Sequence, residues 1–133
     1  MSSVRFMLDT DTVSFSWRGE GQVAANIVAH HPSALCVSAI TIAELRFGAD
    51  KRKSSKLHGK IDTFVSTVEV IPFDEICARH FGAVASALAK EGAPIGEMDV
   101  MIAATAIAAQ ATLITNNVQH FTRVRELRVE NWY

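Results

Sequence analysis

Short apolar runs alternate with helical segments along this chain, and the first run ends in a carboxylate. Phe6, Met7 and Leu8 lead straight into Asp9, which is the pattern of a buried strand within residues 4–9. Similar runs predict strands at 35–38, 68–71 and 112–115, and a last strand near 127–129. The carboxyl edge of an open α/β sheet is where ligands bind, so Asp9 is the first candidate site residue.

Helical periodicity fills the segments between these runs. Thr41 followed by Glu44 has the form of a capping box, and Asp74 precedes a long helical stretch. A polar segment over residues 50–60 is expected to be a loop and a helix start. Alternating strands and helices predict one domain over residues 1–133, an α/β/α fold with a central parallel sheet. The predicted helices lie at residues 11–17, 22–31, 41–48, 61–68, 75–90 and 100–109.

Composition excludes several classes of protein. The 133 residues are 49% hydrophobic and 20% charged, with a formal net charge of -1, which argues against binding nucleic acid through bulk positive charge. Cys36 and Cys77 lack paired spacing, so we interpret them as buried thiols of a cytoplasmic protein. The uncharged run from 100 to 122 contains many polar side chains, so it does not predict a membrane helix.

Acidic and amide side chains stand at strand ends and helix starts. Asp9, Glu44, Asp99 and Asn117 should all meet at the carboxyl edge of a parallel sheet. Three carboxylates there repel one another unless a cation lies between them. Oxygen ligands of this kind suit Mg²⁺ or Mn²⁺ and not zinc.

Each of these residues also has a purely structural interpretation. Asp9 could cap the following helix, Glu44 could complete the capping box, and Asn117 could be a turn residue. Glu97 and Asp99 both favour a helix N-terminus, and Asp99 adjoins the all-apolar helix. The five histidines show neither HxxxH nor HExxH spacing, and no GxSxG or Walker loop is present, which leaves metal chemistry based on carboxylates as the favoured hypothesis.

The chain resembles the PIN-domain ribonuclease toxins of the VapC type from bacterial toxin–antitoxin pairs. The resemblance covers essentially the whole chain and rests on the order and spacing of its motifs. These motifs are Met7-Leu8-Asp9-Thr10, Ile40-Thr41-Ile42-Ala43-Glu44-Leu45, Pro94-Ile95-Gly96 with Asp99, Leu113-Ile114-Thr115-Asn116-Asn117 with Phe121, and Leu127-Arg128-Val129-Glu130-Asn131-Trp132.

The resemblance implies a homodimeric ribonuclease with an acidic site for one or two Mg²⁺ or Mn²⁺ ions. Such proteins cut single-stranded or loop RNA, and a cognate antitoxin covers the site. By position, Asp9, Glu44 and Asp99 are the metal-binding acids. The fourth acidic position falls on Asn117, where many relatives have Asp, and this removes one negative charge. In enterobacterial relatives the substrate is initiator tRNA, cut in the anticodon loop.

Other residues are expected to support these acids or to hold RNA. Supporting groups beside the acids are Thr10, Asp11, Ser38, Glu97 and Thr115, where Asp11 replaces the Asn common in the family. Candidate RNA contacts are Trp17, for base stacking, and the basic side chains Lys51, Arg52, Lys53 and Lys56.

Two alternatives stay open at this point. Asp9 and Asp11 after an apolar strand match the DxDx(T/V) motif of haloacid-dehalogenase-like phosphatases, although the lysine of that family has no good counterpart because Lys90 lies inside a helix. A phosphatase would lose its acid/base group with Asp11→Asn, whereas a PIN nuclease should tolerate this change. The third hypothesis is a non-catalytic interaction module.

Overall fold

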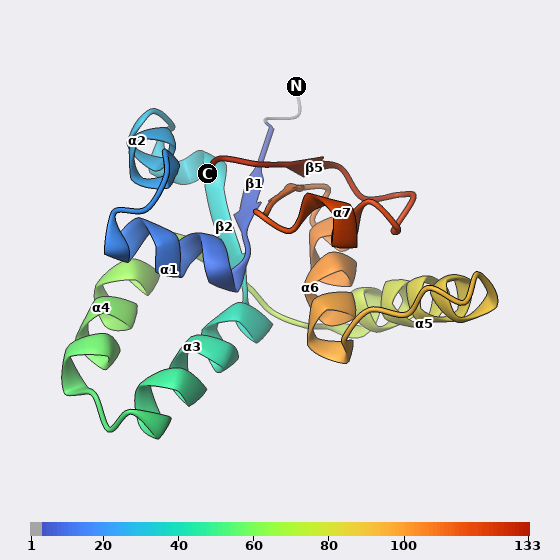
Figure 1. Ribbon diagram of the computed structural model, residues 1–133, viewed down its shortest axis with the longest axis horizontal. Coiled ribbons are helices and arrows are strands. Elements are labelled where there is room, and N and C mark those ends of the chain that lie inside the picture. Colours follow the sequence, from blue (N-terminus) through green and yellow to red (C-terminus); the bar gives the residue numbers. More distant parts are fainter. Residues whose placement is uncertain (1–3) are drawn as a thin grey trace.

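A five-stranded parallel sheet forms the centre of the computed structural model, which describes residues 4–133 (Figure 1). The strand order is β3-β2-β1-β4-β5, and every neighbouring pair is parallel. The chain crosses between parallel strands through helices or long connections. The strands are β1 (Phe6–Leu8), β2 (Leu35–Ser38), β3 (Glu69–Ile71), β4 (Thr112–Ile114) and β5 (Val129–Glu130).

Helices cover both faces of this sheet, so the predicted α/β/α architecture is confirmed. A single 3₁₀ turn, Pro32–Ala34, leads into β2. The helices are α1 (Thr10–Arg18), α2 (Val23–Val28), α3 (Ala39–Lys51), α4 (Ser55–Val65), α5 (Glu75–Lys90), α6 (Glu97–Ala108) and α7 (Val118–Phe121).

The capping-box prediction at Thr41 is wrong. Helix α3 begins at Ala39, and the Ser38 side chain caps it by accepting a hydrogen bond from the Ile40 N–H at 3.0 Å. Thr41 is fully buried inside the helix, so Glu44 lies further along α3 than a capping residue would. Ser38 ends a buried strand with its hydroxyl already beside the first free N–H groups, which is why the helix starts there.

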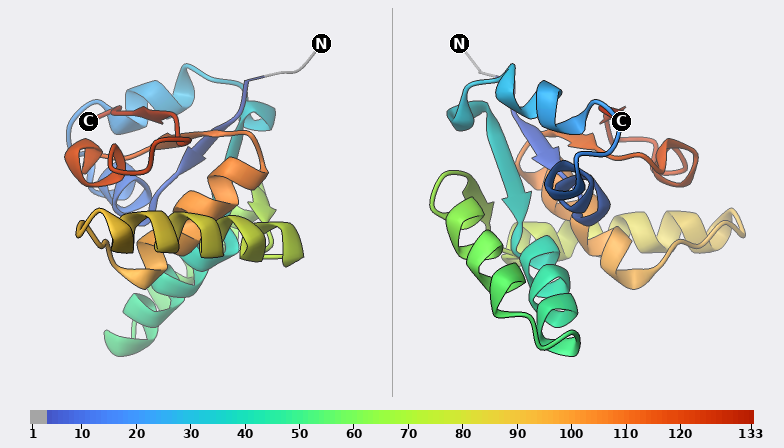
Figure 2. Two further views of the ribbon diagram at one scale, coloured as in Figure 1. Left: turned by 90° about the vertical axis from the view of Figure 1, so that its right-hand side faces the viewer. Right: turned by 60° about the vertical axis from the view of Figure 1, so that its left-hand side comes forward.

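The polar segment over residues 50–60 is also more helical than predicted. Helix α3 continues to Lys51, and α4 begins at Ser55, so only a short turn separates them. Arg46 of α3 donates hydrogen bonds to the Asp62 carboxylate and to the His58 ring, both on α4. These contacts join the two helices into a hairpin that extends past the sheet (Figure 2).

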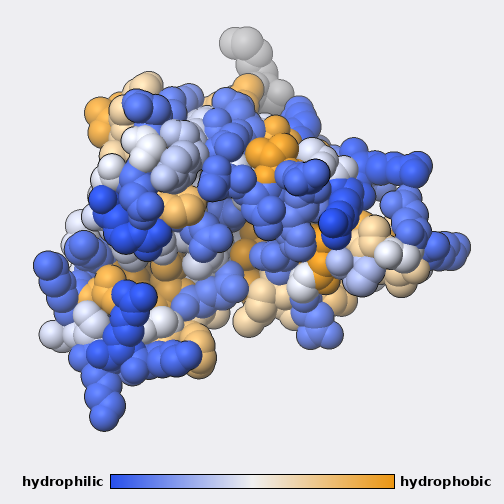
Figure 3. Space-filling model, viewed as in Figure 1, coloured by the Kyte–Doolittle hydropathy of each residue, from blue (hydrophilic) through white to orange (hydrophobic). Residues whose placement is uncertain are grey.

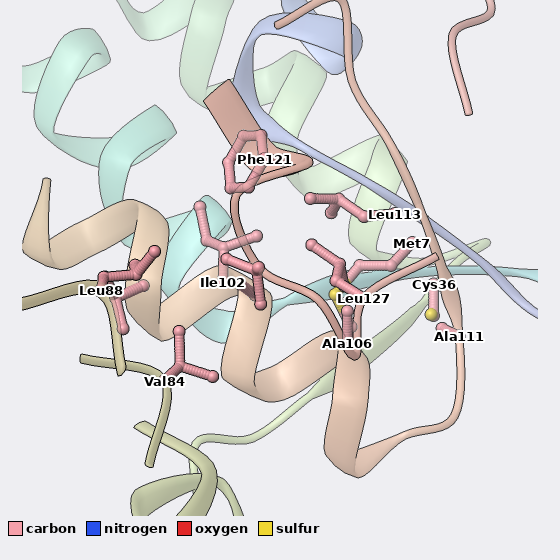
Figure 4. Close-up of a cluster of buried hydrophobic side chains, with 13 residues drawn as sticks. Met7, Cys36, Val84, Leu88, Ile102, Ala106, Ala111, Leu113, Phe121 and Leu127 are labelled. Atoms are coloured by element: carbon pink, nitrogen blue, oxygen red, sulfur yellow. The ribbon is translucent and has the colours of Figure 1, made fainter. Parts of the chain in front are cut away.

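Side chains of the central strands alternate between the two faces, as the pleat requires. Met7, Cys36 and Leu113 face the larger core cluster, which α5 and α6 cover (Figure 4). Leu8 and Ile114 face the second cluster together with α1, α3 and α4. The two layers fix the ends of β1, β2 and β4 between helices, and this places Asp9 at the carboxyl edge of the sheet.

Two further predictions concern the cysteines and the membrane. Cys36 and Cys77 are both buried free thiols, as expected, and burial raises the pKa of the Cys36 thiol to about 11. Among residues 4–133, no helix has both the length and the apolar character needed to cross a membrane.

Candidate active site

Asp9 connects the end of β1 to the start of α1. Its backbone N–H donates to the Ile114 carbonyl at 3.0 Å, which continues the pairing with β4. Its Oδ1 accepts the Thr12 N–H at 2.8 Å, so Asp9 caps α1. Only 6% of the residue is exposed. Burial raises the pKa of the Asp9 carboxyl, against the lowering effect of hydrogen bonds from Thr115 and Thr12.

Glu44 projects from α3 toward the start of α1. The Thr10 hydroxyl donates to Glu44 Oε1 at 2.5 Å, and it also lies 3.4 Å from the Thr41 hydroxyl. Burial is the largest cause that raises the pKa of Glu44, and the Thr10 hydrogen bond opposes it. The charges of Asp99, Asp11 and Asp9 raise this pKa further, so Glu44 shares an electrostatic environment with all three.

Asp99 lies in the first turn of α6, which begins after Gly96. Its Oδ2 is 3.0 Å from Nε2 of His120, a residue of α7 that is 21 positions away in the sequence. No pattern in the sequence pointed to His120, because it has no second histidine at zinc-ligand spacing. Glu97 is exposed in the same turn, and within residues 4–133 its side chain makes no hydrogen bond or ion pair. The structure therefore brings Asp99, and not Glu97, into contact with a second element.

The predicted supporting residues lie in different environments. The buried Thr115 hydroxyl accepts the Asn117 N–H at 3.0 Å, and it lowers the pKa of Asp9 against the effect of burial. Ser38 is buried between α3 and α6, 3.4 Å from the Thr105 hydroxyl, so its contacts are with helices and not with the acids. Asp11 is exposed in the first turn of α1, and its charge raises the pKa of both Asp9 and Glu44.

Asn117 stands at the N-terminus of α7, beyond the end of β4. Its side chain is exposed and gives no capping hydrogen bond to α7. The side chain makes no hydrogen bond to the three acids in the part of the chain that the structure describes. The contact that the structure shows at Asp99 comes from His120, and the role of Asn117 stays a prediction.

Asp9 and Asp99 lie near enough to Glu44 for their charges to raise its pKa. Across residues 4–133, no three His, Cys, Asp or Glu side chains stand close enough to hold a metal ion together. Over the same residues, no lysine or arginine pairs with Asp9, Glu44 or Asp99. The raised pKa values of Asp9 and Glu44 show that negative charge is disfavoured there. Oxygen donors in such a field fit a hard divalent cation, because its charge would offset their repulsion.

A groove leads away from Glu44 between α1, α3 and α4. This α1–α4 groove encloses about 210 Å³, begins at Thr10 and Glu44, and passes Trp17, whose ring packs edge-on against Phe64 at 6.2 Å. Apolar side chains form its floor, and basic side chains stand along it. Its other lining residues are Ser14, Arg18, Leu45, Gly48, Ala49, Arg52, Leu57, Lys60 and Ile61.

The predicted RNA-binding residues gather around the end of this groove. Lys51, Arg52, Lys53 and Lys56 are all exposed where α3 turns into α4. Figure 3 shows hydrophilic residues at this tip, in the same view as Figure 1. Only Arg52 of these four lines the groove, and Lys60, which the sequence did not single out, lines it as well. A wider hollow of about 810 Å³ lies among residues 4–5, 106–107, 109–111 and 126–128, and none of Asp9, Glu44 and Asp99 lines it.

Comparison with known proteins identifies the family to which this chain belongs. The family model for the PIN domain matches residues 6–127, so this is a PIN-domain protein. The tRNA(fMet)-specific endonuclease VapC of Salmonella typhimurium is 33% identical over 130 residues, which are 97% of this chain and 98% of that protein. Ribonuclease VapC2 of Haemophilus influenzae is 35% identical over the same proportions. The chain belongs to the VapC family of PIN-domain ribonucleases.

Solved structures agree with this assignment. VapBC2 from Rickettsia felis, bound to a DNA fragment from its promoter, matches this structure with a TM-score of 0.90 and 32% sequence identity. The match covers 98% of this chain and 100% of that chain. DNA-bound VapBC from Salmonella typhimurium gives the same TM-score, identity and coverage. Because these matches extend over the whole fold, the phosphatase alternative for Asp9 and Asp11 is set aside.

Proposed function

We propose that this protein is a Mg²⁺- or Mn²⁺-dependent endoribonuclease that acts in the cytoplasm as the toxin of a toxin–antitoxin pair. The observation that carries the proposal is that Glu44 of α3 contacts Thr10, the residue that follows Asp9 at the carboxyl end of β1. The pKa of Glu44 responds to the charges of both Asp9 and Asp99. The membership of this chain in a ribonuclease family supports a hydrolytic role for the site.

Hydrogen bonds from neighbouring residues orient Asp9 and Glu44 in the absence of RNA. Asp9 is fixed by its backbone bond to Ile114 and by the Thr12 N–H on one carboxylate oxygen. Glu44 is fixed by the Thr10 hydroxyl. Asp9, Glu44 and Asp99 would hold the divalent ion, which supplies a bound water of lowered pKa and offsets charge on the phosphoryl oxygens.

The proposed substrate is structured RNA with an exposed single-stranded segment. The relative from Salmonella typhimurium is named for its action on tRNA(fMet), which supports the anticodon loop of initiator tRNA as the target here. Arg52 and Lys60 along the α1–α4 groove can contact phosphates next to the acids. Trp17 in the same groove presents an aromatic surface for a base.

The proposed partners are a cognate antitoxin and a second copy of the chain. The solved relatives are VapBC complexes, and this supports an antitoxin that covers the acidic site. The apolar floor of the α1–α4 groove, with Leu45 and Ile61, opens directly beside Glu44 and suits a bound protein segment. A homodimer is proposed from the family resemblance.

The proposal is tested by mapping RNA ends after brief expression of the wild type, of Asp99→Asn and of Glu126→Gln. We expect Asp99→Asn to reduce cleavage more than about 100-fold, because losing a metal ligand should exceed the effect of groups around the ligands. Glu126→Gln makes the same carboxylate-to-amide change on the exposed far edge of the sheet, and it should cut like the wild type. The same variants are then assayed on purified tRNA with Mg²⁺ or Mn²⁺.

Two results would contradict this function. An Asp99→Asn protein that folds, binds its metal and cuts RNA at the wild-type rate would remove Asp99 from the site. A wild-type protein that neither binds Mg²⁺ or Mn²⁺ in calorimetry nor cleaves RNA would favour the non-catalytic interaction module.

A further inference from the structure

His120 contacts Asp99 from α7, an element for which the sequence motifs include Phe121 but not His120. Its Nε2 lies 3.0 Å from Asp99 Oδ2, and the two side chains are 23% and 38% exposed. Within residues 4–133, this is the only side-chain hydrogen bond or ion pair that Asp99 makes. The contact joins the one-turn helix α7 to the first turn of α6, so it links two segments that the chain brings to the site separately.

The position of His120 is fixed by the core. Phe121, the next residue, is only 2% exposed and packs in the larger hydrophobic cluster. The N–H groups of His120 and Phe121 both donate to the Asn117 carbonyl, at 3.2 and 3.3 Å. The His120 ring stands edge-on to the Phe121 ring with centroids 5.3 Å apart. Figure 4 shows Phe121 directed into this cluster, and burying it leaves His120 on the side of α7 that faces Asp99.

Each of the three acids lies against at least one hydrogen-bonding group. Thr12 donates its N–H to Asp9, and Thr10 donates its hydroxyl to Glu44. His120 completes the set for Asp99. A donor that engages one oxygen restricts the rotation of the carboxylate, and groups that orient metal ligands in this way strengthen metal binding.

We propose that His120 is the positioning residue of Asp99. Its Nε2–H donates to Oδ2 and thereby orients the carboxylate for a divalent cation. The role rests on the metal site of the proposed function and deepens it.

The first test is calorimetric titration of Mn²⁺ into metal-free protein, without RNA. His120→Ala should weaken Mn²⁺ binding by about 10- to 100-fold, the range found for groups that orient metal ligands. His120→Gln keeps an N–H donor on a side chain of similar reach, and it should recover most of the affinity. Asn117→Ala should weaken binding much less than His120→Ala. Thermal melting of each variant shows whether it remains folded.

The second test observes the hydrogen bond itself in the metal-free protein. A long-range ¹H–¹⁵N spectrum distinguishes the two neutral forms of the ring, and we expect the proton on Nε2. A neutral ring protonated on Nδ1 would overturn the proposal, because Nε2 would then have no hydrogen to donate.

The outcomes separate this role from the proposed function. A wild type that binds Mn²⁺ while His120→Ala binds it equally tightly refutes the role of His120 alone. A His120→Gln variant as weak as His120→Ala refutes it too, since a donor would then be insufficient. A wild type that binds no Mn²⁺ refutes the metal site and this role with it. Loss of Mn²⁺ affinity in His120→Ala, with recovery in His120→Gln, supports the role even if the RNA target proves to be different.

Discussion

Replacing Thr10 by Val removes the hydroxyl that holds Glu44 while keeping the shape of the side chain. The hydroxyl donates to Glu44 Oε1 at 2.5 Å, and this bond counters the burial and carboxylate repulsion that raise the pKa of Glu44. Hydrogen bonds to charged groups contribute about 1.5–3 kcal/mol. Glu44 is only half-buried, so we take about 1 kcal/mol. This corresponds to a roughly fivefold weaker Kd for the metal ion.

The change also predicts a direction for pH dependence. Without Thr10, the ionised form of Glu44 loses a donor, so its pKa should rise further. Metal binding needs the carboxylate, and the acidic limit of activity should therefore move to higher pH. The assay measures Mn²⁺ affinity by calorimetry and RNA cleavage across pH for the wild type, Thr10→Val and Thr10→Ser.

Thr10→Ser is the matched control, because it keeps the hydroxyl and loses only a methyl group. We expect its acidic limit to stay close to that of the wild type. The proposed role of the Thr10 hydroxyl is refuted if Thr10→Val binds Mn²⁺ as tightly as the wild type at every pH. It is also refuted if Thr10→Ser shifts the acidic limit of activity as much as Thr10→Val does.

Two further predictions concern stability. Burial raises the pKa of Asp9, so the folded chain keeps this proton to a higher pH than the unfolded chain, and the metal-free protein should lose stability as pH rises through that raised pKa. Melting curves in EDTA between about pH 4 and pH 7 should show this loss in the wild type and a smaller loss in Asp9→Asn, whose amide still caps α1; equal slopes would contradict it. Ser38→Ala removes the cap of α3 and should lower the free energy of unfolding by about 1–2 kcal/mol. Urea denaturation measures this cost, and an unchanged midpoint would show that the Ser38 cap does not stabilise α3.

Local sequence determined the strands and most of the helices. The apolar run before Asp9 identified β1, and the same kind of pattern located β2 and β4. Alternation of strands and helices then required a parallel sheet, whose carboxyl edge collects the residues that follow each strand. For this reason the sequence alone predicts that Asp9 and Asp99 belong to one site.

Tertiary structure decided the choices between residues that are close in sequence. Both Ser38 and Thr41 have a hydroxyl suited to a helix cap, and Ser38 caps α3 because the buried strand β2 ends there. Asn117 and His120 lie three positions apart around the one-turn helix α7. The burial of Phe121 in the core fixes how that turn is rotated, so His120 faces Asp99. Rotation of a short helix depends on the packing of distant residues, which no local pattern contains.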